Sequence, residues 1–305
     1  MNNELIVTSS PHVRSQDSVD KIMWSVVLAL LPAVFAAVYF FSARAISVIL
    51  AAVAGAVLTE YIFQKVRNRK ITIKDGSAVV TGLLLALTLP PSIPLWTAFL
   101  GSVVAIGLGK QVFGGIGHNP FNPALVGRAF LTAAYPVLMT TWTVDGVSTA
   151  TPLSQMKMEG VATDTWRLFI GQIGGSLGET SALALLLGFA YLLYKGYVNW
   201  RIPLSMIGTV FLGMFIFGSD PIFHLFGGGL MIGALYMATD MVSSPTTKLG
   251  RWIFGIGAGF LVVVIRLWGG YPEGVMYSIL LMNTAVPLID RYTRPRSLGE
   301  VKTNG

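Results

Sequence analysis

The sequence contains no cysteine, and only 11% of its 305 residues are charged. Without cysteine, the chain alone forms no disulfide, thiolate zinc site or iron–sulfur cluster. The three histidines, His12, His118 and His224, are too far apart in the sequence to indicate a haem pair or metal centre. Charged residues make up about 25% of ordinary soluble domains. This chain therefore has too little charge to cover the surface of a soluble protein.

Apolar residues make up 53% of the chain and fall into ten runs. The first run is longer than the apolar core of about 7–15 residues in a signal peptide, so we expect a retained helix. Several runs are shorter than the roughly 20 residues that cross a bilayer as a helix. The sequence predicts an all-α polytopic membrane protein with ten transmembrane helices, some of them broken or re-entrant. The runs are 22–41, 45–63, 78–89, 95–108, 126–139, 181–194, 202–218, 222–238, 252–268 and 275–289.

The distribution of basic residues predicts the orientation. If the N-terminus is cytoplasmic, 16 of the 21 lysines and arginines lie on the cytoplasmic side, including the basic run 65–70. Cytoplasmic loops carry such an excess of positive charge. We therefore expect both termini inside a bacterial cytoplasmic membrane and the polar interval 140–180 outside. These loops also explain the net charge of +7, so nucleic acid is not an expected partner.

Five runs precede the polar interval and five follow it, so the second set enters the membrane from the opposite side. Each half also has an apolar run that meets prolines or polar residues, followed by a Gly-Gly pair before its last run. Interrupted helices of this kind line a site near the midplane in proteins built from inverted repeats. The predicted organisation is a five-helix repeat over 22–139, an outward loop over 140–180, an inverted five-helix repeat over 181–290 and a cytoplasmic tail over 291–305.

Asn119 and Asn122 stand in a glycine-rich stretch, and each is followed by proline. Proline after each asparagine excludes a continuous helix here. One interpretation is that the two amides bind a polar ligand such as a flavin ring. The other is that they cap and turn a re-entrant loop.

Three charged residues lie deep in apolar surroundings: Glu60, Arg128 and Asp240. A membrane arginine is a functional-site hypothesis by default, although Arg128 could instead bond to the loop carbonyls just before it. Glu60 and Asp240 are candidates for an ion pathway. The alternatives are an ion pair between Glu60 and Lys65, and a helix cap made by Asp240.

The polar interval contains a segment that runs from Asp145 through Ser148 and Thr149 to Thr151 and Pro152. Taken alone, Asp-Gly followed by serine and threonine indicates a solvated turn. Its neighbours suggest more than a turn.

The string from Gly109 through Phe121-Asn-Pro-Ala-Leu125 to Arg128-Ala-Phe130, together with Asp145 to Leu153, resembles the D-subunit family of the Rnf ferredoxin:NAD oxidoreductases. It is also similar to the homologous B subunits of the sodium-pumping NADH:quinone reductases. The resemblance covers essentially the whole chain. It implies a subunit of a redox-driven pump that relays electrons between ferredoxin and NAD and moves Na⁺ or H⁺. The implied partners are further subunits that carry iron–sulfur clusters and flavins.

The resemblance also implies the cofactors. FMN is expected on Thr151 through a phosphoester bond, beside Asp145, Ser148 and Thr149, with Thr149 where the family usually has glycine. A second, non-covalent flavin, riboflavin, is expected at Asn119 and Asn122, and Arg128 is a further expected flavin contact. The alternative function is a solute channel or transporter with the inverted-repeat layout of urea and ammonium carriers. A simple channel has no need for the segment that ends at Thr151.

Overall fold

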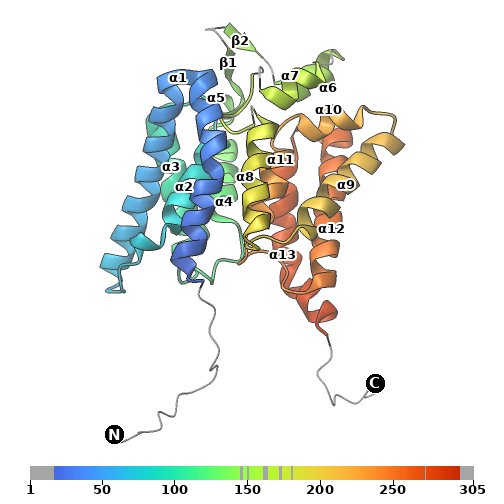
Figure 1. Cartoon of the computed structure of the whole chain (residues 1–305). Helices are drawn as coiled ribbons and strands as arrows, with labels where there is room; N and C mark the ends of the chain where they lie inside the picture. Colours follow the sequence, from blue (N-terminus) through green and yellow to red (C-terminus); the bar gives the residue numbers. More distant parts are fainter. Residues whose placement is uncertain are drawn as a thin grey trace, which may run out of the picture.

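The computed structural model describes residues 17–144, 147–149, 151–160, 164–171, 174–179, 181–271 and 273–295. The described chain is almost entirely helical, and its longer helices pack side by side along one direction (Figure 1). Shorter helices and one small hairpin cover one end of this bundle.

The first helix, α1 (Val19–Val66), contains both of the first two apolar runs. Ser18 caps its start by accepting a hydrogen bond from the backbone N–H of Lys21. At Ser42 the backbone leaves the helical region, with φ 53° and ψ −143°. Figure 1 shows the two arms of α1 side by side, joined at the end of the bundle that carries the hairpin.

The remaining helices of the first half are shorter. The 3₁₀ turn η1 precedes α2, and α3 continues directly into the π-helix η2. The bounds are η1 (Ile73–Asp75), α2 (Ser77–Leu87), α3 (Leu95–Ile106), η2 (Gly107–Gln111), α4 (Pro123–Ala134) and α5 (Pro136–Thr140). The predicted run 126–139 is therefore not one helix, because Pro136 has no N–H to continue α4 and α5 begins there.

The second half starts with two helices of ordinary geometry and then breaks. Its bounds are α8 (Ala182–Tyr194), α9 (Arg201–Ile216), α10 (Pro221–Phe226), α11 (Leu230–Ile232), the π-helix η3 (Gly233–Met237), α12 (Lys248–Trp268) and α13 (Val275–Thr293). The predicted single run 222–238 is wrong as one helix. Gly228, with φ +70°, turns the chain between α10 and α11.

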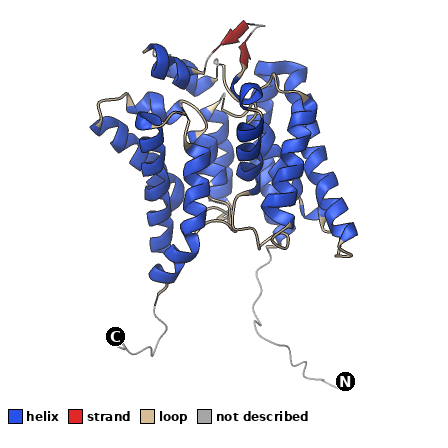
Figure 2. Ribbon diagram, turned by 180° about the vertical axis from the view of Figure 1, so that it is seen from behind, coloured by secondary structure: helices blue, strands red, loops and turns tan. Residues whose placement is uncertain are grey.

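The interval 140–180 is more ordered than the loop expected there. Strands β1 (Trp142–Val144) and β2 (Val147–Thr149) form an antiparallel hairpin, and α6 (Pro152–Glu159) and α7 (Thr165–Ile170) follow. Figure 2 shows the hairpin in red at one end of the bundle, opposite the start of α1 and the end of α13.

The broken helices end on hydrogen bonds from distant parts of the chain. The backbone N–H groups of Leu177 and Gly178 donate to the carbonyls of Leu89 and Leu87 at the end of α2, with N–O distances of 3.1 and 2.6 Å. The side-chain Nδ2 of Asn122 donates to the carbonyl of Met237 at the end of η3, at 3.2 Å. Both helix ends are thus satisfied inside the protein, as membrane depth requires.

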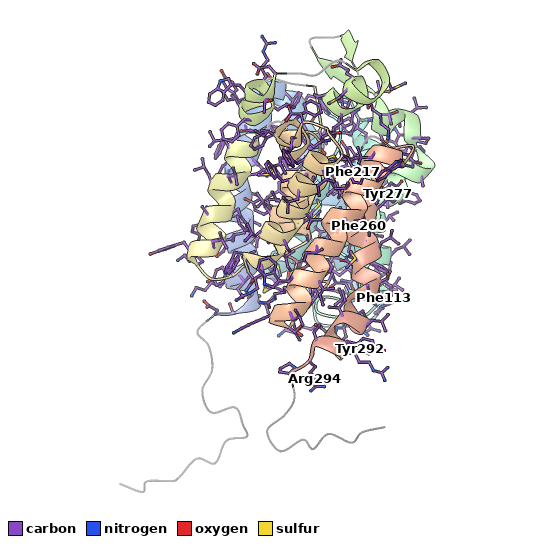
Figure 3. The ribbon with its side chains drawn as sticks, turned by 90° about the vertical axis from the view of Figure 1, so that its right-hand side faces the viewer. Phe113, Phe217, Phe260, Tyr277, Tyr292 and Arg294 are labelled. Atoms are coloured by element: carbon purple, nitrogen blue, oxygen red, sulfur yellow. The ribbon has the colours of Figure 1, made fainter. Side chains whose placement is uncertain are left out.

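The outer surface of the bundle is apolar. By length and composition, α1 and α12 are suited to cross a membrane, and α2, α4, α8 and α9 are shorter apolar helices. Large apolar side chains are exposed on several helices, for example Phe260 on α12, which is 60% exposed (Figure 3). Soluble monomers rarely expose apolar patches of such extent. The exterior is that of a membrane protein.

The two halves meet most closely at Gly188 of α8. A Cβ atom built there would lie 1.7 Å from the carbonyl oxygen of Ala29 and 2.3 Å from the hydroxyl of Tyr236. That hydroxyl lies 2.9 Å from the carbonyl oxygen of Leu185 and 3.2 Å from that of Ala29. One small contact therefore joins α1, α8 and η3.

We predict that Gly188→Ala destabilises the purified chain, because the new methyl group must push α8 away from α1. Overpacking of this kind costs about 1–3 kcal/mol. The midpoint of thermal unfolding in detergent measures the effect. Gly208→Ala is the matched control, because no atom lies within 4 Å of a Cβ built at that position on α9. Equal loss of stability in both variants would contradict the prediction.

Candidate functional site

An outer cavity of about 380 Å³ lies below the hairpin, between the two halves. The first half contributes α4, α5 and β1 to its wall, and the second half contributes the start of α13. The described residues that line it include Arg128, Met139, Trp142, Thr151, Glu273 and Tyr277. Its volume falls in the range of about 300–1,000 Å³ typical of small-molecule sites.

Thr151 is the N-cap of α6. Its hydroxyl oxygen accepts a hydrogen bond from the backbone N–H of Ser154 at 3.2 Å and lies 3.0 Å from the Ser154 Oγ. Threonine is a favoured N-cap residue, and Pro152 suits the first helical position because it needs no hydrogen-bond partner there. The sequence Thr-Pro-Leu-Ser thus starts a helix and holds a buried hydroxyl at the edge of the outer cavity.

Two contacts fix α6 in place. Leu153 packs with Leu168 and Phe223 in a small buried cluster. On the next turns, the ammonium group of Lys157 donates to three carbonyls at the end of α12, those of Arg266, Gly269 and Tyr271. A cation at a helix C-terminus is favourable because it meets unpaired carbonyls and the negative end of the helix dipole.

Arg128 lies between two carboxylates. Its Nη2 is 2.6 Å from Glu273 Oε2, and its Nη1 is 3.4 Å from Glu179 Oε1. No bond to the loop carbonyls before it is found in the described part of the chain, contrary to the plain alternative. The structure brings Arg128 and Thr151 to the same cavity.

An inner cavity of about 90 Å³ lies towards the opposite end of the bundle. Its lining includes Asn119, Asn122, Asp240, Lys110 and Tyr236. Residues from both halves therefore meet here too, and three of the candidates singled out in the sequence share one small space.

The two asparagines have structural contacts. Asn122 caps α4 by accepting hydrogen bonds from the N–H groups of Ala124 and Leu125, at 3.0 and 3.3 Å. Asn119 donates to the carbonyl of Phe121 at 3.0 Å. These contacts match the cap-and-turn interpretation, while the position of both side chains in the cavity wall is compatible with the ligand interpretation.

Glu60 does not pair with Lys65, contrary to one interpretation of the sequence. Both of its carboxylate oxygens lie 2.8 Å from the Nζ of Lys110, which is also 2.6 Å from Ser77 Oγ. Lys65 instead lies over the ring of Tyr61. The partner of Glu60 is a lysine 50 residues away, and only the packing of η2 against α1 reveals it.

Asp240 accepts a hydrogen bond from Ser243 Oγ at 2.8 Å, in the turn that follows η3. No described helix starts at Asp240, so this turn contact is not the helix cap weighed for it. Sequence reasoning missed Lys110, Glu179 and Glu273. Each is a charged residue close to an apolar run, which is the signal that would have marked them.

Known proteins are similar in sequence to this chain over nearly its whole length. A model of the NQR2, RnfD, RnfE family matches residues 6–299. The chain belongs to this family. The D subunit of the proton-translocating ferredoxin:NAD⁺ oxidoreductase complex of Clostridium ljungdahlii is 50% identical over 320 residues, covering 97% of each chain. The D subunit of the Na⁺-translocating complex of Acetobacterium woodii is 48% identical, covering 98% of this chain and 96% of the relative.

A third member of the NQR2, RnfD, RnfE family, the D subunit of an ion-translocating oxidoreductase complex of Stutzerimonas stutzeri, is 43% identical over 93% of each chain. Relatives named for H⁺ and for Na⁺ are almost equally similar to this chain. Overall similarity therefore favours neither ion.

The structure describes only some of the residues at which this member of the family is expected to carry FMN. Asp145 lies outside the described residues. Ser148 and Thr149 lie in β2, where they pair with Thr143 and Trp142 of β1. Of the four residues expected at the covalent FMN, which are Asp145, Ser148, Thr149 and Thr151, only Thr151 has a described side chain. That side chain lies in the wall of the outer cavity.

We predict that Lys157→Met loosens α6. Hydrogen bonds to a charged group contribute about 1.5–3 kcal/mol each, so the segment 152–159 should exchange its amide hydrogens roughly tenfold faster or more. Hydrogen–deuterium exchange of the purified chain measures this. Lys70→Met is the control, because Lys70 is an exposed loop lysine. Unchanged exchange in the Lys157 variant would show that Leu153 alone holds the helix.

Proposed function

We propose that this chain is the membrane flavoprotein subunit of an ion-translocating ferredoxin:NAD⁺ oxidoreductase and that it carries FMN on Thr151 through a phosphoester bond. The observation that supports the proposal most strongly is the buried Thr151 hydroxyl at the edge of the outer cavity. The similarity to the D subunits of three such complexes over nearly the whole chain supports the same function.

The residues of the outer cavity suit this group. Trp142, Tyr271 and Tyr277 supply aromatic surface for a planar ring, and Arg128, paired with Glu179 and Glu273, supplies a guanidinium in the wall. An ester at Thr151 places the phosphate at the N-terminus of α6, where negative charge is favoured. The threonine oxygen, once esterified, still has a lone pair to accept the hydrogen bond from Ser154.

When bound, a flavin accepts one or two electrons and so exchanges them with one-electron and two-electron carriers. This chain has no cysteine to hold an iron–sulfur cluster. We therefore propose that partner subunits with iron–sulfur clusters and flavins supply and remove the electrons. The chain itself positions its cofactor through α6, excludes water with the apolar cavity wall and holds the ion-paired Arg128 in that wall.

We further propose a non-covalent riboflavin at Asn119 and Asn122. Both side-chain amides line the inner cavity, Asn122 from the N-cap of α4 and Asn119 from the loop before it. The cavity, at about 90 Å³, is smaller than the roughly 300 Å³ at the lower end of small-molecule sites. Riboflavin therefore binds there only if the adjacent glycine-rich loop moves. Acid extraction of flavin from Asn119→Leu protein tests this, because loss of the released flavin is expected.

Glu60 and Asp240 remain our proposed ion-pathway residues for Na⁺ or H⁺. Asp240 lines the inner cavity, and Glu60 is one side chain away from it through Lys110. Redox-driven ion uptake into vesicles that hold the whole complex with its Asp240→Asn subunit tests the assignment, and undiminished uptake contradicts it.

We also propose ten transmembrane segments in two inverted repeats, over 22–139 and 181–290, in a bacterial cytoplasmic membrane with both termini inside. A short helix that ends within the bundle occurs in each half, α2 in the first and α11 with η3 in the second. A π-helix also occurs in each half, η2 and η3. The solute-channel alternative is less well supported, because it gives no reason for the similarity to oxidoreductase subunits.

The covalent FMN gives a direct prediction. Thr151→Val should lose the flavin fluorescence that the wild-type chain keeps on a denaturing gel, because valine has no oxygen to form the ester. A peptide that contains Thr151 should carry the mass of FMN minus water in the wild type. Thr149→Val is the matched control and should keep the label. A label that persists in Thr151→Val moves the attachment site elsewhere.

The orientation is tested with single cysteines, which a chain without native cysteine makes clean. Cysteine at the exposed Met158 of α6 should react with an impermeant maleimide added to intact cells. Cysteine at Lys70 should react only after the membrane is opened, because this basic loop is proposed to be cytoplasmic. The reverse pattern contradicts both the orientation and the inverted repeat as stated.

A further inference from the structure

Four charged side chains surround the glycine turn between α10 and α11, directly beside the outer cavity. They are Arg128 of α4, Glu179 from the segment before α8, Arg266 of α12 and Glu273 before α13. Arg266 uses its guanidinium on the carbonyls of His224 and Gly227. Arg128 is the cation that forms ion pairs with both carboxylates, and Arg266 acts on the same two carboxylates from a greater distance.

Arg128 is shared unequally. Glu273 has the short contact, at 2.6 Å, and its side chain is 23% exposed. Glu179 has a contact of 3.4 Å, at the limit of hydrogen bonding, and its side chain is only 3% exposed. A buried carboxylate needs strong partners to stay ionised. Of these two carboxylates, Glu179 is thus the one whose negative charge is less well stabilised.

We infer that Glu179 is a proton-binding group that responds to the charge held in the outer cavity. The inference rests on the proposed FMN at Thr151, since that group would bring the charge. The change is a simple protonation: the carboxylate takes a proton from a hydronium ion of the solvent and releases a water molecule, and no electron moves in this step. Arg128 connects the cavity with Glu179, because Arg128 lines the cavity and also contacts the Glu179 carboxylate.

The surroundings of Glu179 support this role. It lies in the interval 140–180, outside the proposed spans. Burial, reinforced by the negative charge of Glu273, raises the pKa of Glu179 to about 7, while the contacts with Arg128 and Ser176 act in the opposite direction. Arg128, Arg266 and Glu273 are the charged groups at this cluster, and the titratable groups that face them from the neighbouring elements are Tyr277, Tyr271 and His224.

The sign of the coupling follows from charge. A raised pKa means that the carboxyl stays protonated up to a higher pH. A phosphodiester in the cavity adds one negative charge, which disfavours the ionised carboxylate and raises the titration midpoint further. Each electron added to a group in the cavity acts in the same direction. Proton uptake at Glu179 then keeps the total charge of the buried cluster constant.

Difference infrared spectroscopy of the purified, flavin-loaded chain as a function of pH tests the inference, because a protonated carboxyl has a separate C=O stretching band. The flavin-loaded wild type should show such a band with a titration midpoint above 7, because the phosphodiester raises the pKa of Glu179 beyond its value of about 7 in the chain without flavin. Glu179→Gln should lose it, and Glu179→Asp should keep a displaced band, which shows that the site still folds. Asp164→Asn is the control, because Asp164 is an exposed carboxylate that caps α7 in the same interval.

Thr151→Val tests whether the titration midpoint of Glu179 depends on the charge in the outer cavity. Without the phosphodiester, the midpoint should fall by about one pH unit, the effect of one charge roughly 10 Å away at an effective dielectric constant of about 20. A band that persists in Glu179→Gln overturns the assignment. An unchanged midpoint in Thr151→Val overturns the coupling. If the wild type carries no flavin, the proposed function fails, while the comparison of wild type with Glu179→Gln still tests the protonation.

Discussion

The structure depends on one constraint: helices that stop inside the bundle must have their last carbonyls satisfied by protein. The end of α2 receives its donors from Leu177 and Gly178, and the end of η3 receives one from Asn122. Each donor comes from a part of the chain far from the helix that it caps. Because water is absent at membrane depth, these bonds are the condition on which broken helices exist at all. Residues of both shortened helices, α2 and η3, line the inner cavity.

The outer and inner ends solve different problems with the same means. At the outer end, Lys157 and Leu153 hold a short helix whose N-cap carries the candidate hydroxyl. At the inner end, Lys110 neutralises Glu60 within the bundle. In both places a lysine pairs with oxygen atoms that have no water to hydrate them. These are backbone carbonyls for Lys157 and the Glu60 carboxylate for Lys110. Arg128 does the same beside the outer cavity, but between two acids rather than one.

The sequence predicted the helical class of the fold, because apolar runs and the scarcity of charge are local properties of the chain. It also marked Arg128, a charge in an apolar run, and Asn119 and Asn122, amides in a stretch that cannot be continuous helix, whereas Thr151 was marked by the resemblance to a family and not by its surroundings. It misjudged the run 222–238, since an apolar run does not reveal that three consecutive glycines will turn the chain. It also could not pair Glu60 with Lys110 or Arg128 with Glu273, because such partners are set by the packing of distant helices.

The contact at Gly188 also sets an order of events in time. Ala29 is made early, whereas Gly188 and Tyr236 emerge only after the whole outer interval has been synthesised. Contacts between such distant parts of a chain form slowly because a long loop must close first. The contact at Gly188 therefore forms late in synthesis, and a methyl group at position 188 would weaken the joining of the two halves without hindering the folding of α1 itself.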